Sequence, residues 1–282
     1  MVYALGAGAE LVGRSHECDY PEPARKLPVV SKPTIQLDGA SADSIDKAVT
    51  ERLSTGETLY AIDEVLLRKL RPDVILTQNL CRVCAPSGDE LTRAVRSFDV
   101  QPEVLFLTPT NLREIDENIS AVGRAIARQE AATDLILAKR ERVAAVRHAL
   151  SDVTPVRVAF LEWTDPVFCA GHWVPEMISL AGGHDPLGRP GEDSVRVEWE
   201  QVAAGNPELV IVSPCGYRLD DAVKLARSLP KIPGATVYAV DANAYFARPG
   251  PRVAEGVELL AHLFHPDKFG WPHQHKPWQR ID

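Results

Sequence analysis

The sequence predicts an α/β protein built of two lobes with mainly parallel sheets, which are joined by one long α-helix. First, short buried-strand patterns alternate with helical patterns along most of the 282 residues, an order typical of parallel sheets. Second, an unbroken helical pattern runs from Leu112 to about Leu150. Third, residues 66–81 and 201–215 share a helix end, a proline, an acidic residue, a buried strand and a cysteine. This internal similarity indicates two related lobes, one on each side of the long helix.

The first lobe is expected to occupy residues 1–110. The helix at 41–56 carries apolar residues on one face and ends at a glycine, and the helix at 63–72 ends at Pro72, which cannot continue a helix. The elements expected in this lobe are helices at 2–12, 41–56, 63–72 and 88–97, an extended segment at 28–37, and strands at 73–78 and 103–109.

The connecting helix is expected at residues 111–150. The pattern contains no proline and only one glycine, Gly123. At about 1.5 Å per residue it would be roughly 55 Å long, which exceeds the width of a small domain. Its apolar positions do not keep a strict heptad, so a helix that bridges two lobes is favoured over a coiled coil.

The second lobe is expected at residues 151–265, followed by an irregular tail at 266–282. The tail region holds His265, His273 and His275 among two tryptophans and three prolines, and the prolines exclude a regular helix. Either a loosely packed extension or a metal-binding tail fits this composition. The elements expected in the lobe are strands at 157–163, 208–214 and 236–242, helices at 172–183, 219–229 and 250–264, and a strand-to-helix step at 194–205.

Composition excludes several classes of protein. The net charge of −8 argues against a nucleic-acid binder that neutralises phosphates. No run of about 18 apolar residues could form a transmembrane helix. Neither a phosphate-binding loop, a dinucleotide fingerprint nor a nucleophile elbow is found, so no enzymatic activity is expected.

The expected compartment follows from the cysteines and the N-terminus. Five cysteines are an odd number, which fits free thiols better than a disulfide framework. The first residues lack the basic start and apolar core of a secretory signal. The sequence as it stands therefore predicts a cytoplasmic protein, and a periplasmic or cell-surface one if an N-terminal segment is missing.

Candidate metal ligands cluster on loops that follow predicted strands. Ligands of open parallel sheets sit beyond the carboxyl ends of the strands, where Asn243 is also expected. A C-x-x-C pair is typical of zinc and thiol-redox sites. One hypothesis is therefore a cytoplasmic zinc, iron or thiol-redox protein, and the alternative is that these side chains are small buried residues or loop anchors. The candidate ligands are His16, Cys18, Cys81, Cys84 and Cys215.

Four motifs in one order resemble a known family. The chain is similar to the substrate-binding proteins of ABC importers, and most to the branch of cobalamin-binding proteins. The similarity covers Val2 to Phe264. The motifs are "VYALGAGAELVGRSHECDYP" at 2–21, "RPDVILTQ" at 71–78, "DPVFCAGHW" at 165–173 and "DANAYFARPGPR" at 241–252.

The resemblance implies a class III substrate-binding protein with two Rossmann-like lobes, which binds a corrinoid or similar chelate in the cleft between them. An ABC permease and ATPase are the implied partners. It also implies that Tyr20 packs against one face of the ligand and that Tyr245 and Phe246 pack from the opposite lobe. Core positions for Tyr245 and Phe246 are the alternative. The cobalt of the corrinoid is a further candidate for ligation by members of one group of side chains, namely His16, Cys18, Cys81, Cys84, His172 and Cys215.

Three more residues are candidates for binding an anionic side chain of such a ligand. His172 and Trp173 open a predicted helix, whose first backbone N–H groups favour anions. Arg248 could hold a carboxylate or phosphate with its guanidinium fork, and a surface salt bridge is the alternative. Family members also begin with a strand and a "P-S-x-T-E" turn that would precede Met1. The first strand of the N-terminal lobe is therefore expected to be missing.

Overall fold

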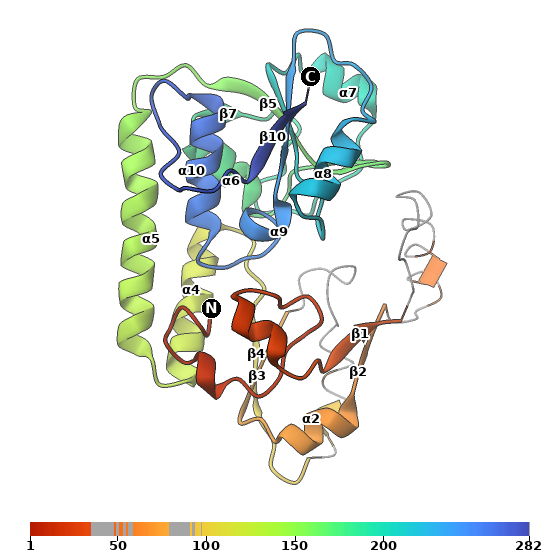
Figure 1. Ribbon diagram of the computed structural model, residues 1–282, viewed down its shortest axis with the longest axis vertical. Helices are drawn as coiled ribbons and strands as arrows, with labels where there is room; N and C mark the ends of the chain where they lie inside the picture. Colours follow the sequence, from red (N-terminus) through yellow and green to blue (C-terminus); the bar gives the residue numbers. More distant parts are fainter. Residues whose placement is uncertain are drawn as a thin grey trace. The chain divides into compact units, whose positions relative to one another are not determined.

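The chain folds into two compact units in a computed structural model (Figure 1). The first unit comprises Met1–Thr108 and Asp116–Leu135, and the second comprises Pro109–Ile115 and Ile136–Asp282. The structure describes residues 1–34, 48, 51–52, 55, 59–78, 91, 94–96 and 98–281. The expected helix at 41–56 therefore lies largely outside the described residues, as does the segment that holds Cys81 and Cys84.

The first unit contains short strands and helices. β1 and β2 pair antiparallel, whereas β3 and β4 pair parallel in the register Val74 with Glu103 through Thr77 with Phe106. The expected helix at 2–12 is instead a series of turns and one 3-10 helix. The elements are η1 (Gly8–Glu10), η2 (Glu22–Lys26), β1 (Ser31–Pro33), β2 (Tyr60–Ile62), α2 (Glu64–Leu70), β3 (Val74–Thr77) and β4 (Glu103–Phe106).

Local chemistry explains the bounds of α2. The Asp63 carboxylate accepts a hydrogen bond from Leu66 N at 2.9 Å and so caps the first turn. The helix ends at Leu70, because Arg71 adopts a left-handed φ of 47° and Pro72 follows it. β3 then begins close to the expected position, with Ile75 packed against a small core that includes Leu67.

The expected long helix is two helices, α4 (Leu112–Ala125) and α5 (Gln129–Ala149). The chain turns at Ala127, whose φ is 53°, and Arg128 N donates to the Gly123 carbonyl at 2.6 Å. A Cβ on Gly123 would lie only 2.5 Å from the Cβ of Ala132, so the two helices approach closely beside the turn. The prediction of one continuous helix is therefore wrong. The turn is made by packing and contains no proline that would have marked it in the sequence.

The second unit is built on a mainly parallel sheet in the order β10-β9-β8-β5-β6. β5, β8 and β9 are parallel, β6 and β10 run antiparallel to their neighbours, and β7 pairs parallel with the start of β5. The strands are β5 (Val156–Thr164), β6 (Val167–Cys169), β7 (Gly183–His184), β8 (Leu209–Val212), β9 (Thr236–Val240) and β10 (Trp278–Ile281). The helices are α6 (Val174–Leu180), α7 (Trp199–Ala204), α8 (Leu219–Ala226), α9 (Ala242–Tyr245) and α10 (Val253–Phe264).

The core of the second unit explains why these strands are apolar throughout. Residues 158–161 of β5 are buried on both faces of the sheet, as expected for a parallel strand covered by helices. Val210 and Val212 of β8 pack with Val202 of α7 and Ala222 of α8. The predicted α/β fold with mainly parallel sheets is confirmed.

The tail is more ordered than the sequence predicted. Its last residues form β10, which pairs with β9 from Trp278 opposite Val240 to Ile281 opposite Val237. The expectation of an irregular tail over 266–282 is wrong for this part. A four-residue edge strand gains its order from the strand beside it, and the prolines before it carry no strand signal.

Candidate ligand-binding site

The carboxyl ends of β5, β8 and β9 define one edge of the sheet in the second unit. Because these strands are parallel, the loops that follow them emerge at the same edge, where open α/β sheets bind ligands. Trp163 lies at the end of β5, Tyr217 in the loop after β8, and Asn243 in α9 directly after β9. This edge, with Trp163, Cys215, Tyr217 and Asn243, is called the carboxyl edge below.

An aromatic pair dominates the carboxyl edge. The rings of Trp163 and Tyr217 meet edge to face, with centroids 5.2 Å apart and an interplanar angle of 69°. Trp163 Nε1 donates to the carbonyl of Asp165 at 3.0 Å. Both side chains are half-buried, so each keeps apolar surface for a ligand to cover.

The hydroxyl of Tyr217 keeps its proton at neutral pH. Burial raises the pKa of this phenol, and the nearby Asp221 carboxylate raises it further. Tyr217 therefore offers a neutral hydrogen-bond donor beside an aromatic ring. Sequence reasoning missed both Trp163 and Tyr217. Their position at or just after predicted strand ends is the signal that could have found them.

The loop after β8 is fixed by backbone hydrogen bonds from both sides. Cys215 N donates to the carbonyl of Glu162 at 3.1 Å, and Asn243 N donates to the carbonyl of Tyr217 at 3.3 Å. Gly216 lies between them with a φ of 86°, a conformation that favours glycine. The loop thus holds Tyr217 between β5 and α9, and Cys215 in the same loop is exposed.

Glu162 joins β5 to two further loops. Its carboxylate accepts a hydrogen bond from Gly171 N at 2.9 Å and another from the Ser194 hydroxyl. A Cβ on Gly171 would lie 2.4 Å from Ser194 N, so the two loops touch at this point. These contacts make Glu162 a structural residue that supports the strand end carrying Trp163.

In the first unit, hydrogen bonds from two arginines stabilise the loop that carries Tyr20. The Arg14 guanidinium donates to the carbonyls of Ser15, at 3.0 Å, and Arg25, at 3.3 Å. Arg25 Nε donates to the carbonyl of Asp19 at 3.0 Å. The Tyr20 side chain is 64% exposed. A braced loop with an exposed aromatic side chain suits contact with a flat ligand.

The predicted metal ligands are distributed over both units. His16 Nδ1 lies 3.1 Å from the Ser31 hydroxyl, and its ring lies 5.2 Å from that of Tyr60. Cys18 is exposed, with Sγ 3.2 Å from the Ser15 hydroxyl. Cys215 belongs to the second unit, and Cys81 and Cys84 lie outside the described residues. In the described part of the chain, no three His, Cys, Asp or Glu side chains are grouped to hold a metal ion.

Three aromatic residues that were candidates for the ligand site lie in the core instead. Tyr245 and Phe246 are 1% and 2% exposed, and Phe246 packs edge to face on Phe160 with centroids 5.3 Å apart. Trp173 is also buried, and its Nε1 donates to the Phe246 carbonyl at 2.9 Å. The sequence around residue 245 reads as a loop because of its prolines. The short helix α9 nevertheless directs the rings of Tyr245 and Phe246 inward, which agrees with the alternative expectation that both are core residues.

His172 and Arg248 lie nearer the surface. His172 adopts a left-handed φ of 50°, its N donates to the Glu192 carbonyl, and its Nε2 lies 3.0 Å from Asp193 Oδ1. Arg248 is half-buried in the segment between α9 and α10. Both remain candidates for binding an anionic group.

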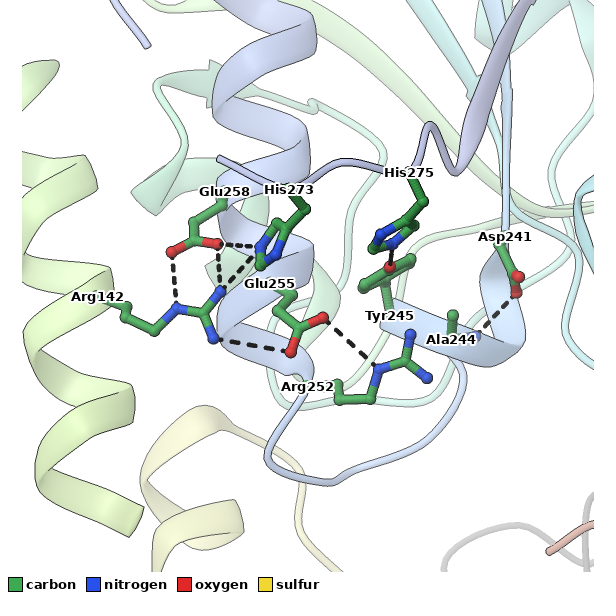
Figure 2. A network of polar contacts seen from close by, with 9 residues as sticks. All are labelled: Arg142, Asp241, Ala244, Tyr245, Arg252, Glu255, Glu258, His273 and His275. Carbon is green, nitrogen blue, oxygen red and sulfur yellow. Dashed lines mark hydrogen bonds and ion pairs between the residues drawn. The ribbon is translucent and has the colours of Figure 1, made fainter. Parts of the chain in front are cut away.

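A polar network surrounds the inward-facing Tyr245 (Figure 2). Its hydroxyl is hydrogen-bonded to His275 Nε2, and the Arg252 guanidinium lies 4.7 Å above its ring. Further along α10, Arg142 of α5 forms an ion pair with Glu258 through two nitrogens, and His273 Nε2 lies 3.1 Å from both partners. The network connects the tail to α9, α10 and α5.

The sequence of the chain matches the family model described as periplasmic binding protein over residues 1–233. The chain belongs to the periplasmic binding protein family. Members of this family are substrate-binding proteins that take part in transport and are not enzymes, so the prediction of no enzymatic activity is confirmed by the family. The predicted resemblance is likewise confirmed.

Relatives and solved structures agree with this assignment. The vitamin B12-binding protein of Vibrio cholerae is 23% identical over 263 residues, which are 92% of this chain and 83% of that protein. The crystal structure of a periplasmic haem-binding protein from Pseudomonas aeruginosa is similar with a TM-score of 0.70 at 18% identity, covering 100% of this chain and 93% of that one. The structure of the periplasmic vitamin B12 binding protein of Vibrio cholerae has a TM-score of 0.60 at 23% identity, covering 93% and 91%.

The family corrects the predicted compartment. A cytoplasmic location was expected from the free cysteines and the first residues, and this prediction is wrong, because the family is one of periplasmic proteins. An odd number of cysteines is thus a weak guide to compartment in this chain. Among the described residues, no helix is both long enough and apolar enough to cross a membrane.

Proposed function

We propose that this chain is the ligand-binding component of an ABC importer and that its ligand is a corrinoid or a similarly flat metal chelate. Its partners would be the permease and ATPase of the importer. The names of its relatives support the ligand class, since they include vitamin B12-binding and cobalamin-binding proteins. Solved structures of the same fold include haem-binding proteins, and haem is also a flat metal chelate.

The observation that carries the proposal is the aromatic pair at the carboxyl edge. A flat ligand presents large apolar faces, and an aromatic side chain can bury roughly 150–250 Å² against such a face at low entropic cost. Trp163 and Tyr217 offer half-buried rings where the strands end. In the first unit, Tyr20 offers an exposed ring on a braced loop.

Polar groups near the pair suit the periphery of such a ligand. A corrinoid carries amide side chains and a haem carries carboxylates. The Tyr217 hydroxyl and the Asn243 side chain match amides, and the Arg248 guanidinium matches a carboxylate or phosphate. Which of these groups is used depends on the ligand, so the polar contacts set specificity and the aromatic rings supply most of the affinity.

Calorimetric titration of the purified chain tests the proposal. The panel contains cyanocobalamin, aquocobalamin, haemin, a ferric siderophore and zinc ions. We expect one equivalent of one flat chelate to bind with a dissociation constant of about 1 μM or lower. Binding of haemin alone would keep the flat-chelate class and reject the corrinoid. Heat from zinc alone, or from nothing on the panel, would contradict the proposal.

A further inference from the structure

The C-terminal segment 271–281 lies against α9, the one-turn helix at the carboxyl edge. β10 pairs with β9 up to its last residue, Val240, opposite Trp278. One step further, the Pro277 carbonyl accepts a hydrogen bond from Asp241 N at 3.0 Å. The segment therefore holds the chain directly before α9.

The same segment holds the other end of α9. His275 Nε2 is hydrogen-bonded to the hydroxyl of Tyr245, the last residue of the helix, and the two rings are nearly parallel with an angle of 13° (Figure 2). Trp271 packs edge to face on Tyr245 with centroids 6.3 Å apart. Burial raises the pKa of Tyr245, so its hydroxyl keeps a proton to donate to the histidine at neutral pH.

α9 depends on these attachments for its position. It spans only Ala242–Tyr245, and a helix of one turn is not stable alone in water. Within this turn, Asp241 Oδ1 accepts from Ala244 N at 2.9 Å, and Phe246 N donates to the Ala242 carbonyl at 2.9 Å. The remaining constraints come from neighbouring parts of the chain, which include the segment 271–281.

The position of α9 affects the aromatic pair of Trp163 and Tyr217 through a hydrogen bond. Asn243 N donates to the Tyr217 carbonyl at 3.3 Å, and the Tyr217 ring packs on Trp163. A continuous set of contacts thus runs from His275 through Tyr245 and Asn243 to Tyr217. The segment itself is anchored on α10 and α5, where His273 lies 3.1 Å from both Glu258 and Arg142.

We propose that His275 and Pro277 are positioning residues, which hold α9 at both ends and thereby set Tyr217 and Asn243 at the carboxyl edge. This inference rests on the proposed function: the segment 271–281 contributes to ligand affinity although it does not itself contact the ligand. The contribution acts through the hydrogen bond between Asn243 and Tyr217.

Amide hydrogen exchange without ligand tests the positioning directly. In His275→Ala, we expect exchange at Asn243, Phe246 and Tyr217 to become roughly tenfold faster, because α9 and the loop it supports open more often. The amides of Leu209–Val212 in β8 should keep wild-type exchange. His275→Gln should restore much of the protection, since its amide can still bond to the Tyr245 hydroxyl. Tyr245→Phe, which keeps the buried ring and removes only the hydroxyl, should reproduce the effect of His275→Ala.

Ligand affinity provides the second measurement. For the chelate that binds in the titration above, His275→Ala and Tyr245→Phe should each weaken binding roughly fivefold, the effect of one hydrogen bond. His148→Ala, an exposed histidine of α5, is the control and should change neither measurement. Wild-type exchange at Asn243 and Tyr217 in both variants would overturn the inference. Failure of the wild-type chain to bind any chelate would instead refute the proposed function, while the exchange experiment would still decide the role of the tail.

Discussion

At the scale of single residues, aromatic side chains divide into two groups. Trp163, Tyr217 and Tyr20 are half-buried or exposed, whereas Tyr245 and Phe246 are buried. Composition cannot separate these groups, because both follow strands or lie in proline-rich segments. Their burial separates them. Substitution of a buried ring is expected to lower stability, whereas substitution of a half-buried or exposed ring is expected to affect ligand binding.

Phe246→Ala should destabilise the protein strongly. Its ring is 2% exposed and packs on Phe160, so truncation leaves a cavity, and we expect the free energy of unfolding to fall by about 3–5 kcal/mol. Tyr20→Ala should change it by less than about 0.5 kcal/mol, because Tyr20 is 64% exposed. Denaturation in urea measures both. Equal stabilities of the two variants would show that Phe246 is not a core residue.

Trp163→Ala should weaken ligand binding. The indole supplies part of the aromatic surface at the carboxyl edge, and we expect the dissociation constant of the bound chelate to rise about tenfold or more. Phe106→Ala removes a more exposed ring, 47% exposed, in β4 of the first unit, and serves as the control. Similar affinities of the two variants in calorimetry would argue against a role for Trp163.

At the scale of elements, the helix turn between α4 and α5 depends on a glycine. Gly123→Ala would place a Cβ 2.5 Å from that of Ala132, and we expect overpacking to lower the free energy of unfolding by about 1–3 kcal/mol. Ala132→Gly in the same chain removes the clash and should recover part of this loss. Thermal unfolding of the single and double variants measures the effect, and additive losses would contradict the close approach.

The same elements show how far the sequence predicts the structure. The sequence predicts apolar strands such as β3, β5 and β8 because apolar runs between glycine and proline residues are a local signal. The turn at Ala127 was missed because helix-favouring residues continue through it. β10 and the inward turn of α9 were missed because each is set by neighbours distant in sequence. The local sequence pattern thus predicts that a helix or strand exists. Tertiary contacts decide where it bends and which of its side chains are buried.

At the scale of the whole molecule, the family assignment and the proposed site at the carboxyl edge together support the proposed function. The family model covers residues 1–233, and the periplasmic members of the family point to a periplasmic rather than a cytoplasmic location. Cys215 and Asn243 follow parallel strands as expected, and their part in a ligand site stays a prediction. Trp163 and Tyr217 were not among the predicted site residues.

The central claim is that a flat chelate binds at the carboxyl edge. Hydrogen exchange of the wild-type chain with and without saturating cyanocobalamin tests it most directly, and haemin replaces cyanocobalamin if the titration favours it. We predict added protection at 161–165, 213–218 and 241–248. Protection confined to other surfaces, such as the groove lined by Arg147, His148 and Ser179, would contradict the claim.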